Sequence, residues 1–289
     1  MSGAPAALEQ VVLHSETLDV TVLPGVGARL HRLTVDGHDL LRTPADPRAH
    51  LTDPFFWGGY HMAPWCNRLP AAPVQYGERV INLPINFPDG TAIHGQVYAA
   101  PWRQVGDSEF GVEAGGNGWP WPYGVEASFG VDRRTLRIEQ RLTNLADEPM
   151  PAGIGLHPWF RRPVELLIRA QRFYSSNLDS EPEPRPVEGA WDMLTRTQPA
   201  AGLDATWTAI AHPPVELAWP GLGIRAEMHV GPTVDHIVAA TPAHIDAIAV
   251  EPETHAPQAL RRVLNGEPGG LRILQPGEQL ALTAQFAFI

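Results

Sequence analysis

Proline and glycine interrupt this chain along its whole length. Its 289 residues include 30 prolines and 27 glycines, without a collagen-like period. Proline disrupts a helix interior or a central strand, whereas both residues are common in turns. The simplest fold that uses so many turns consists of many short strands joined by tight connections.

The segments between these turns alternate between apolar and polar residues. Residues 10–22 and 135–145 have a period near two, as half-buried strands do. Asp36-Gly37 predicts a two-residue hairpin turn. Only residues 254–264 could form a helical turn or two, and no repeat of 20–50 residues is visible. We therefore predict an all-β fold, a large antiparallel β-sandwich that forms a single domain over residues 1–289.

Two segments are too rich in glycine and proline for regular structure. Residues 52–72 carry five aromatic side chains between Phe55 and Trp65, and residues 115–123 read Gly-Gly-Asn-Gly-Trp-Pro-Trp-Pro-Tyr. We predict loops at both places. Loops with many aromatic residues either plug a core or line a site, and the sequence leaves both possibilities open.

Charge and cysteine content exclude several classes of function. The formal net charge of −11 argues against nucleic acids and anionic membranes as partners. No run reaches the roughly 18 apolar residues of a membrane helix, and residues 1–10 do not resemble a signal peptide. The single cysteine, Cys66, rules out an internal disulfide and a multi-cysteine metal site. We expect a cytoplasmic monomer or homodimer.

Two histidines have unusual neighbours. His157 lies in the apolar segment Gly-Ile-Gly-Leu-His-Pro-Trp-Phe, and Pro158 restricts its backbone to an extended geometry. His94 precedes Gly95 at the end of a probable strand. Each histidine alone is more often structural than catalytic, so neither decides the function.

Glu251 ends the apolar run at residues 245–250. A desolvated carboxylate is costly without partners, and one at a strand end facing a cleft can serve as a base with a raised pKa. Glu253 competes for this role, because two residues along a strand return to the same face. Pro252 argues against a continuing strand.

Several residues suit a sugar ligand. Asn67 and Arg68 place an amide beside a guanidinium, which suits vicinal hydroxyl groups. Trp121 and Trp159 could stack on a pyranose or simply pack in the core.

Other chemistries have weaker support. His94, His157 and Glu251 could bind zinc or iron, but the sequence lacks the usual short spacings between ligands. No Gly-x-Ser-x-Gly motif and no phosphate-binding loop is present, and the chain contains no lysine. Arg161 and Arg162 are the local candidates for binding a phosphate group.

Six segments together resemble the aldose 1-epimerase (galactose mutarotase) family. They occur in the family's order and span nearly the whole chain: Asn-Arg-Leu-Pro at 67–70, Ala-Ile-His-Gly at 92–95, Trp-Pro-Trp-Pro-Tyr at 119–123, Gly-Ile-Gly-Leu-His-Pro-Trp-Phe at 153–160, Gly-Leu-Asp-Ala-Thr-Trp at 202–207 and Val-Glu-Pro-Glu-Thr-His-Ala-Pro-Gln-Ala at 250–259. Glu-Pro at 251–252 replaces the Glu-Thr-Gln of the best-known members and resembles a bacterial branch of the family.

The resemblance implies a galactose mutarotase-like supersandwich that interconverts the α and β anomers of a free aldose without a cofactor. By position, Glu251 resembles the general base, His157 the general acid and His94 the second histidine. Arg68 and Asp204 resemble ligands of the sugar hydroxyls, with Asn67 beside them. Asp235 is the rival of Asp204.

We expect Glu251 and His157 to face each other across a pocket for one monosaccharide. His157 should be protonated in the resting site, because a nearby carboxylate favours the imidazolium. The alternative is a carbohydrate-binding or sugar-sensing module on the same fold, because a fold does not determine its function.

Overall fold

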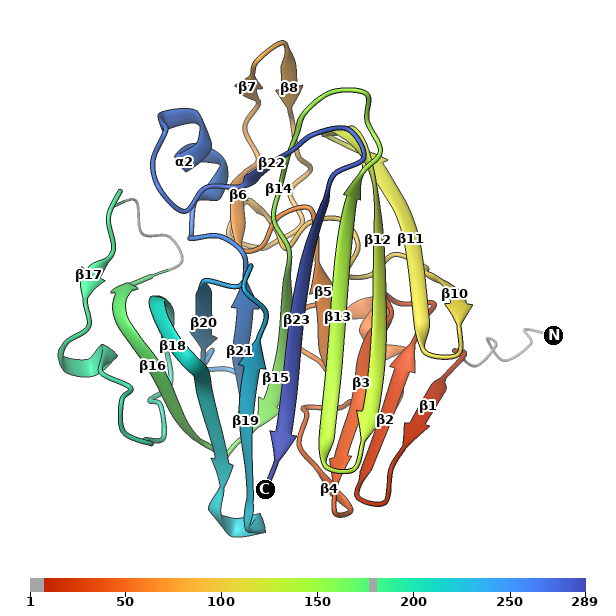
Figure 1. The fold of residues 1–289 in the computed structure, drawn as a ribbon, viewed down its shortest axis with the longest axis vertical. Helices are drawn as coiled ribbons and strands as arrows, with labels where there is room; N and C mark the ends of the chain where they lie inside the picture. Colours follow the sequence, from red (N-terminus) through yellow and green to blue (C-terminus); the bar gives the residue numbers. More distant parts are fainter. Residues whose placement is uncertain (1–7, 177–180) are drawn as a thin grey trace.

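The computed structural model describes residues 8–176 and 181–289. Within them, 17 strands join one continuous, almost wholly antiparallel sheet that curls into two layers (Figure 1). The predicted all-β sandwich is therefore confirmed. No helix within the described residues is long and apolar enough to cross a bilayer. Residues 1–7, part of the segment that lacks signal-peptide features, lie outside the described residues.

The first layer contains the strands that will matter for function. Hydrogen-bonded neighbours run in the order β1, β2, β3, β5, β15, β21, β20, and β4 forms a hairpin with β3. Their bounds are β1 (Val11–His14), β2 (Leu18–Leu23), β3 (Arg29–Val35), β4 (His38–Asp39), β5 (Gly59–Met62), β15 (Gly155–Arg161), β21 (Ala247–Glu253) and β20 (His236–Ala240).

The second layer lies against the first, with strands in the order β10, β11, β12, β13, β23, β19. Its strands are β10 (Arg103–Gly106), β11 (Glu109–Gly116), β12 (Trp119–Asp132), β13 (Thr135–Asn144), β23 (Gln279–Phe288) and β19 (Ile224–Val230). Buried and accessible positions alternate along β12 and β13, as predicted for residues 135–145.

One long hairpin connects the two layers. Strand β18 (Asp204–Trp219) pairs with β20 through residues 204–208 and with β19 through residues 215–219, while β16 (Glu165–Tyr174) follows it on the other side. The short strand β17 (Arg185–Pro186) extends the edge of β16. Because β18 belongs to both layers, the sheet curls without a break.

Smaller elements surround the ends of the sandwich. Three two-stranded pairs are β6 (Arg68–Pro70) with β9 (Thr91–Ile93), β7 (Val74–Tyr76) with β8 (Arg79–Ile81), and β14 (Met150–Ala152) with β22 (Arg272–Leu274). The helical segments are α1 (Ala49–Thr52), α2 (Ala259–Asn265), η1 (Gly189–Trp191) and η2 (Pro220–Leu222). Helix α2 confirms the predicted helical turns, and α1 was not expected.

The main core fills the space between the layers. Phe160 of β15 meets Phe286 of β23 at a ring distance of 5.8 Å. The Gln140 side-chain amide donates to the carbonyl of Met62 at 3.0 Å, and its carbonyl oxygen lies 3.3 Å from Nδ1 of His61. This polar bridge satisfies buried groups of both layers.

The turn prediction at Asp36-Gly37 is confirmed, since both residues have positive φ, of 49° and 80°. The loop predicted at residues 115–123 is limited to residues 117–118, because β11 ends at Gly116 and β12 begins at Trp119. The prolines at the start of β12 are tolerated since the pairing of β12 with β13 begins only at Tyr123, so neither proline interrupts that ladder. The loop predicted at residues 52–72 is interrupted by strands β5 and β6.

Gly95 fixes the backbone just after His94. Its φ is +76°, and an added Cβ would lie 1.9 Å from the carbonyl oxygen of Ala63. Gly90 also has a positive φ, of +85°, but an added Cβ would meet nothing within 4 Å. Comparing alanine substitutions at Gly90 and Gly95 therefore separates the cost of the backbone conformation from the cost of the close contact.

We predict that Gly90→Ala destabilises the protein by roughly 1–2 kcal/mol, the cost of a left-handed alanine. Gly95→Ala should cost roughly 1–3 kcal/mol more, because neighbouring backbone must also move. Urea unfolding of both variants measures the difference. Equal losses of stability would show that the contact between Gly95 and Ala63 is not constraining.

Candidate active site

The register of one strand pair places a histidine opposite a glutamate. In the antiparallel β15–β21 ladder, Gly155 pairs with Glu253 and Trp159 with Ala249. His157 therefore lies directly across from Glu251, and on the other side of β15 it pairs with Tyr60 of β5. Alternation along each strand turns these side chains to the same face of the sheet.

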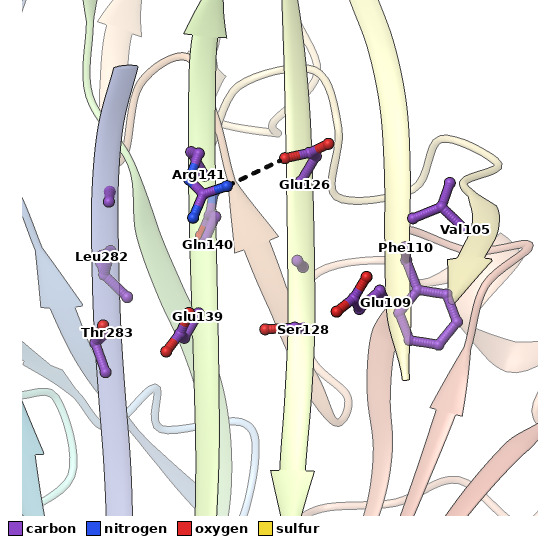
Figure 2. Close-up of a pocket in the computed structure, with 12 residues that line it drawn as sticks. Val105, Glu109, Phe110, Glu126, Ser128, Glu139, Gln140, Arg141, Leu282 and Thr283 are labelled. Carbon is purple, nitrogen blue, oxygen red and sulfur yellow. Dashed lines mark ion pairs between the residues drawn. The ribbon is translucent and has the colours of Figure 1, made fainter. Parts of the chain in front are cut away.

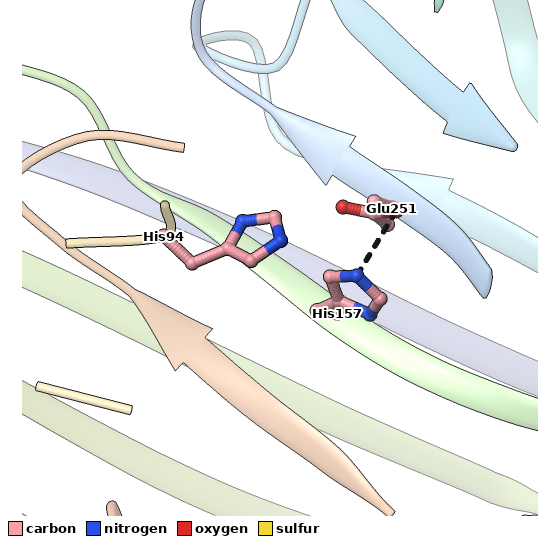
Figure 3. A group of neighbouring side chains, drawn as sticks. All are labelled: His94, His157 and Glu251. Carbon is pink, nitrogen blue, oxygen red and sulfur yellow. Dashed lines mark ion pairs between the residues drawn. The ribbon is translucent and has the colours of Figure 1, made fainter. Parts of the chain in front are cut away.

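His157 and Glu251 point toward each other, as Figure 3 shows. The His157 Nε2 atom lies 3.3 Å from a carboxyl oxygen of Glu251, and the two side chains are 5% and 2% exposed. The sequence prediction that these two groups face each other is therefore matched by the geometry. His157 and Glu251 lie 94 residues apart in the chain.

His94 approaches the pair from the turn after β9. Its φ is +60°, and its ring lies 4.9 Å from the His157 ring in a T-shaped arrangement (Figure 3). The backbone N–H of Asn67 donates to Nδ1 of His94 at 3.2 Å. The ring proton therefore belongs on Nε2, where neutral His94 can donate a hydrogen bond.

The expected imidazolium at His157 is not what the structure favours. Burial, with smaller contributions from Arg29 and Arg68, lowers the pKa of His157 to about 3. The Tyr60 ring stacks on His157 at 4.5 Å, and the buried guanidinium of Arg29 lies 4.8 Å from the Tyr60 ring centre. Burial therefore outweighs the carboxylate in setting the pKa of His157, and this disfavours the imidazolium that the sequence led us to expect.

Glu253 lies on the same face of β21 as Glu251, because the strand continues through Pro252. Pro252 did not end the strand as the sequence suggested. Both carboxyl groups are buried, and the Asn67 amide donates to both oxygens of Glu253, at 3.0 and 2.8 Å. Asn67 therefore holds Glu253, the carboxyl group beside Glu251, in place by hydrogen bonds.

Burial raises the pKa of Glu251, and the nearby Glu253 and Asp204 raise it further. Burial also raises the pKa of Glu253, although its hydrogen bonds with Asn67 and Glu251 oppose this effect. Two desolvated carboxyl groups in contact cannot both ionise readily. The pair therefore retains a proton to a higher pH than an exposed glutamate would.

A cavity of about 290 Å³ opens directly over these groups. This volume is at the small end of the range for small-molecule sites. Polar, aromatic and aliphatic side chains line it: Phe55, Phe56, Tyr60, Asn67, Arg68, Phe87, Ile93, His94, His157, Trp159, Leu203, Asp204, Ala240, Pro242, His244 and Glu251.

Arg68 and Asp204 meet at the cavity wall. The Arg68 guanidinium lies 3.8 Å from a carboxyl oxygen of Asp204, and its Nε donates to Asp89 at 2.7 Å. The rival Asp235 contacts His236 and Arg272 instead and does not line this cavity. Of these two aspartates, Asp204 is thus the one that lines the cavity.

Some predicted residues lie elsewhere. Trp159 lines the cavity, but Trp121 is only 1% exposed and packs in the core against Trp119 and Tyr76. Of the two possibilities left open for Trp121, the structure shows packing in the core, so this candidate sugar-binding residue does not line the cavity. Alternation along β12 turns its side chain inward. Arg161 and Arg162 donate to the carbonyls of Leu41 and Pro199, and neither lines the cavity.

Sequence reasoning missed Phe87 and His244 and left Phe55, Phe56 and Tyr60 undecided. The aromatic density of residues 52–72 was the available signal, but it did not separate residues that line the cavity from those in the core. Phe55 and Phe56 line the cavity, whereas Trp65 is buried in the core. Phe87 and His244 follow no pattern that distinguishes them in the sequence.

A second hollow lies on the second layer (Figure 2). Its walls include Glu109, Glu126, Glu139 and Arg141, and Arg141 pairs with Glu126 at 3.6 Å. No histidine lines it within the described residues. It therefore lacks the acid–base combination of the first cavity.

The three groups in Figure 3 could also hold a metal ion. One ligand atom each from His94, His157 and Glu251 lies within 4.8 Å of the other two. Two imidazoles and one carboxylate suit zinc or iron. The spatial arrangement is thus compatible with a metal site, although the spacing of these residues in the sequence did not favour one.

Comparisons with known proteins agree with this architecture. A sequence model of the aldose 1-epimerase family matches residues 9–287. A galactose mutarotase-like protein from Clostridium acetobutylicum has a similar structure, with a TM-score of 0.84, 16% identity and coverage of 98% of this chain and 95% of that chain. A galactose mutarotase-like protein from Lactobacillus casei has a TM-score of 0.76 and 15% identity, with coverage of 97% of this chain and 100% of that chain. A protein from Synechocystis has a TM-score of 0.79 and 22% identity, with coverage of 100% of this chain and 98% of that chain. No curated protein matches the chain.

Burying two raised-pKa carboxyl groups should make stability depend on pH. A group whose folded pKa is raised stabilises the fold below its unfolded pKa, and this contribution disappears as pH rises through the folded pKa. We predict that Glu253→Gln gains stability relative to wild type as pH rises above the ordinary pKa of glutamate, by about 1.4 kcal/mol for each pKa unit removed.

Urea unfolding at several pH values tests this prediction. Other buried groups contribute equally to both proteins, so the difference between wild type and variant isolates Glu253 and its effect on Glu251. Glu113→Gln, on an exposed position of β11, is the matched control and should show no such gain. Parallel pH curves for wild type and Glu253→Gln would contradict the prediction.

Proposed function

The chain belongs to the aldose 1-epimerase family, and from this premise we propose that it interconverts the α and β anomers of a free aldose. The observation that carries the proposal is the His157–Glu251 contact at the floor of a cavity of monosaccharide size. The reaction needs one proton removed from the anomeric hydroxyl and one delivered to the ring oxygen. A facing acid and base meet this need.

In the proposed mechanism Glu251 is the base and His157 the acid. In the resting form Glu251 is protonated and His157 is neutral. In the active form the two groups are an ion pair. The two forms contain the same number of protons, because they differ only by the transfer of one proton from Glu251 to His157. Hydrogen bonds from a bound sugar to the ionised groups favour the ion pair. Binding thus offsets the burial that lowers the pKa of His157.

The chemical step then proceeds without net change in the protein. Glu251 takes the proton of the anomeric hydroxyl while His157 gives its proton to the ring oxygen, and the bond between C1 and that oxygen breaks. Rotation about the C1–C2 bond presents the other face of the aldehyde. The two groups exchange roles when the ring closes, which restores their original protonation.

The surrounding groups position the sugar. His94 can donate from Nε2 to an oxygen near the anomeric centre, because its Nδ1 is already engaged by Asn67. Arg68 and Asp204 offer donors and acceptors for the other hydroxyls. Holding the reacting groups in place lowers the entropic part of the barrier.

We predict that Glu251→Gln lowers kcat by more than about 100-fold while the protein remains folded, because a carboxamide cannot accept the proton. Exchange NMR between the two anomers of a panel of aldoses measures the rate directly. Circular dichroism checks folding. Near-wild-type exchange in this variant would remove Glu251 from the mechanism, and sugar binding without exchange in the wild type would favour a binding module.

A metal-dependent isomerase is the second candidate, supported by the clustering of His94, His157 and Glu251. The acid–base proposal predicts that incubation with a chelator leaves the exchange rate unchanged. Elemental analysis of the purified protein should find no stoichiometric metal. Loss of exchange with the chelator, restored by zinc or iron, would favour the metal-dependent reaction.

A further inference from the structure

Arg68 is held at the cavity wall by an acid that does not itself line the cavity. The Nε atom of Arg68 donates to Oδ2 of Asp89 at 2.7 Å. Their side chains are 17% and 34% exposed, and of the two only Arg68 is among the residues that line the cavity. A sugar seated in the cavity therefore meets the guanidinium, whereas Asp89 lies outside the wall.

The other side of the Arg68 guanidinium faces Asp204 across an open distance. The Nη1 atom of Arg68 lies 3.8 Å from Oδ2 of Asp204, whereas a direct N–H···O hydrogen bond measures about 2.7–3.2 Å. Both side chains line the cavity. A sugar hydroxyl group placed between them can accept from Arg68 and donate to Asp204 at the same time.

The turn before β9 presents Asp89 to Arg68. The Oδ1 atom of Asp89 accepts hydrogen bonds from the backbone N–H and the hydroxyl of Thr91, at 3.1 and 2.6 Å. Thr91 begins β9, which pairs with β6, the strand that carries Arg68. At the start of the turn, the side chain of Asn86 donates to the carbonyl of Ile93 at 3.0 Å and accepts from its N–H at 2.7 Å. The backbone therefore sets the position of the Asp89 carboxylate.

Two acids thus compete for one guanidinium. The Arg68 guanidinium carbon lies 5.4 Å from the centre of the Phe87 ring, which covers one of its faces. Without Asp89, the acid that Arg68 still contacts is Asp204, and a shift of about 1 Å would bring the two within hydrogen-bonding distance. A closed Arg68–Asp204 pair would occupy the donor and the acceptor that a sugar hydroxyl needs.

On the premise of the proposed function, we propose that Asp89 is a positioning residue for the substrate. It keeps the Arg68 guanidinium from closing on Asp204, so that both groups remain available to the sugar hydroxyls. The proton transfers occur on other strands, at His157 of β15 and Glu251 of β21. Loss of Asp89 should therefore weaken the ground state and the transition state alike, which raises KM and leaves kcat nearly unchanged.

Asp89→Asn is the sharpest variant because it preserves the turn. The amide oxygen can still accept from Thr91, and the amide NH2 group then faces Arg68, where it can neither accept a hydrogen bond nor carry a charge. We predict that KM rises by at least about tenfold while kcat changes by less than about twofold, because a hydrogen bond to a charged group is worth roughly a factor of ten or more. Exchange NMR over a range of concentrations of D-glucose, D-galactose, D-mannose and D-xylose measures both quantities.

Glu148→Gln is the matched control. The Nε atom of Arg79 donates to Oε1 of Glu148 at 2.7 Å, the same distance as in the pair of Arg68 and Asp89, and the two side chains are 49% and 35% exposed. Neither Arg79 nor Glu148 lines the cavity. KM and kcat should therefore match the wild type. An equal rise of KM in both variants would assign the effect to the loss of a surface charge and overturn the role of Asp89.

A double-mutant cycle tests whether Asp89 acts through Arg68. Arg68→Met removes the guanidinium and should raise KM by itself. Adding Asp89→Asn to Arg68→Met should change KM no further, because the group that Asp89 positions is already absent. A rise of KM by the same factor in both backgrounds would show that Asp89 acts independently of Arg68, and this would overturn the proposed role.

The outcomes separate the positioning role from the proposed function. An unchanged KM in Asp89→Asn would overturn the role of Asp89 and leave anomer exchange intact. No exchange by the wild-type protein with any of the four sugars would contradict the proposed function. Dissociation constants for the same sugars, measured by calorimetry, then replace KM in the same comparisons and test Asp89 separately. Absence of binding to all four sugars would contradict both.

Discussion

The site depends on the register between β15 and β21. This ladder sets His157 opposite Glu251, although Pro158 and Pro252 cannot donate backbone hydrogen bonds beside them. The pairs Gly155–Glu253 and Trp159–Ala249 hold the register on either side, and β5 and β20 flank the two strands. A shift of one residue would turn either side chain to the opposite face of the sheet. The contact is therefore a property of the whole layer.

The same layer provides the dry surroundings that tune these groups. Burial lowers the pKa of His157 and raises those of Glu251 and Glu253, so these surroundings disfavour separated charges. Arg29 is itself buried beneath Tyr60 and held by the carbonyls of Trp57 and Tyr98. In this account a bound sugar makes hydrogen bonds to the ionised forms of His157 and Glu251. Sugar binding is therefore coupled to proton transfer between these two groups.

The sequence predicted the parts of the molecule that local patterns determine. Alternation predicted the β13 strand, Asp36-Gly37 predicted the turn between β3 and β4, and the resemblance suggested His157 and Glu251 as partners. It failed where a distant neighbour decides the outcome. Pro252 did not end β21, and Trp121 is in the core because β12 is already a strand there. The protonation of His157 depends on burial by segments that the local sequence does not reveal.

A crystal structure with a bound aldose would test the central claim most directly. The account predicts that the anomeric hydroxyl and the ring oxygen lie within roughly 2.6–3.2 Å of the Glu251 carboxyl group and His157 Nε2, respectively. Arg68 and Asp204 should contact the remaining hydroxyls. A sugar seated in the cavity with its anomeric carbon directed away from both His157 and Glu251 would contradict the account.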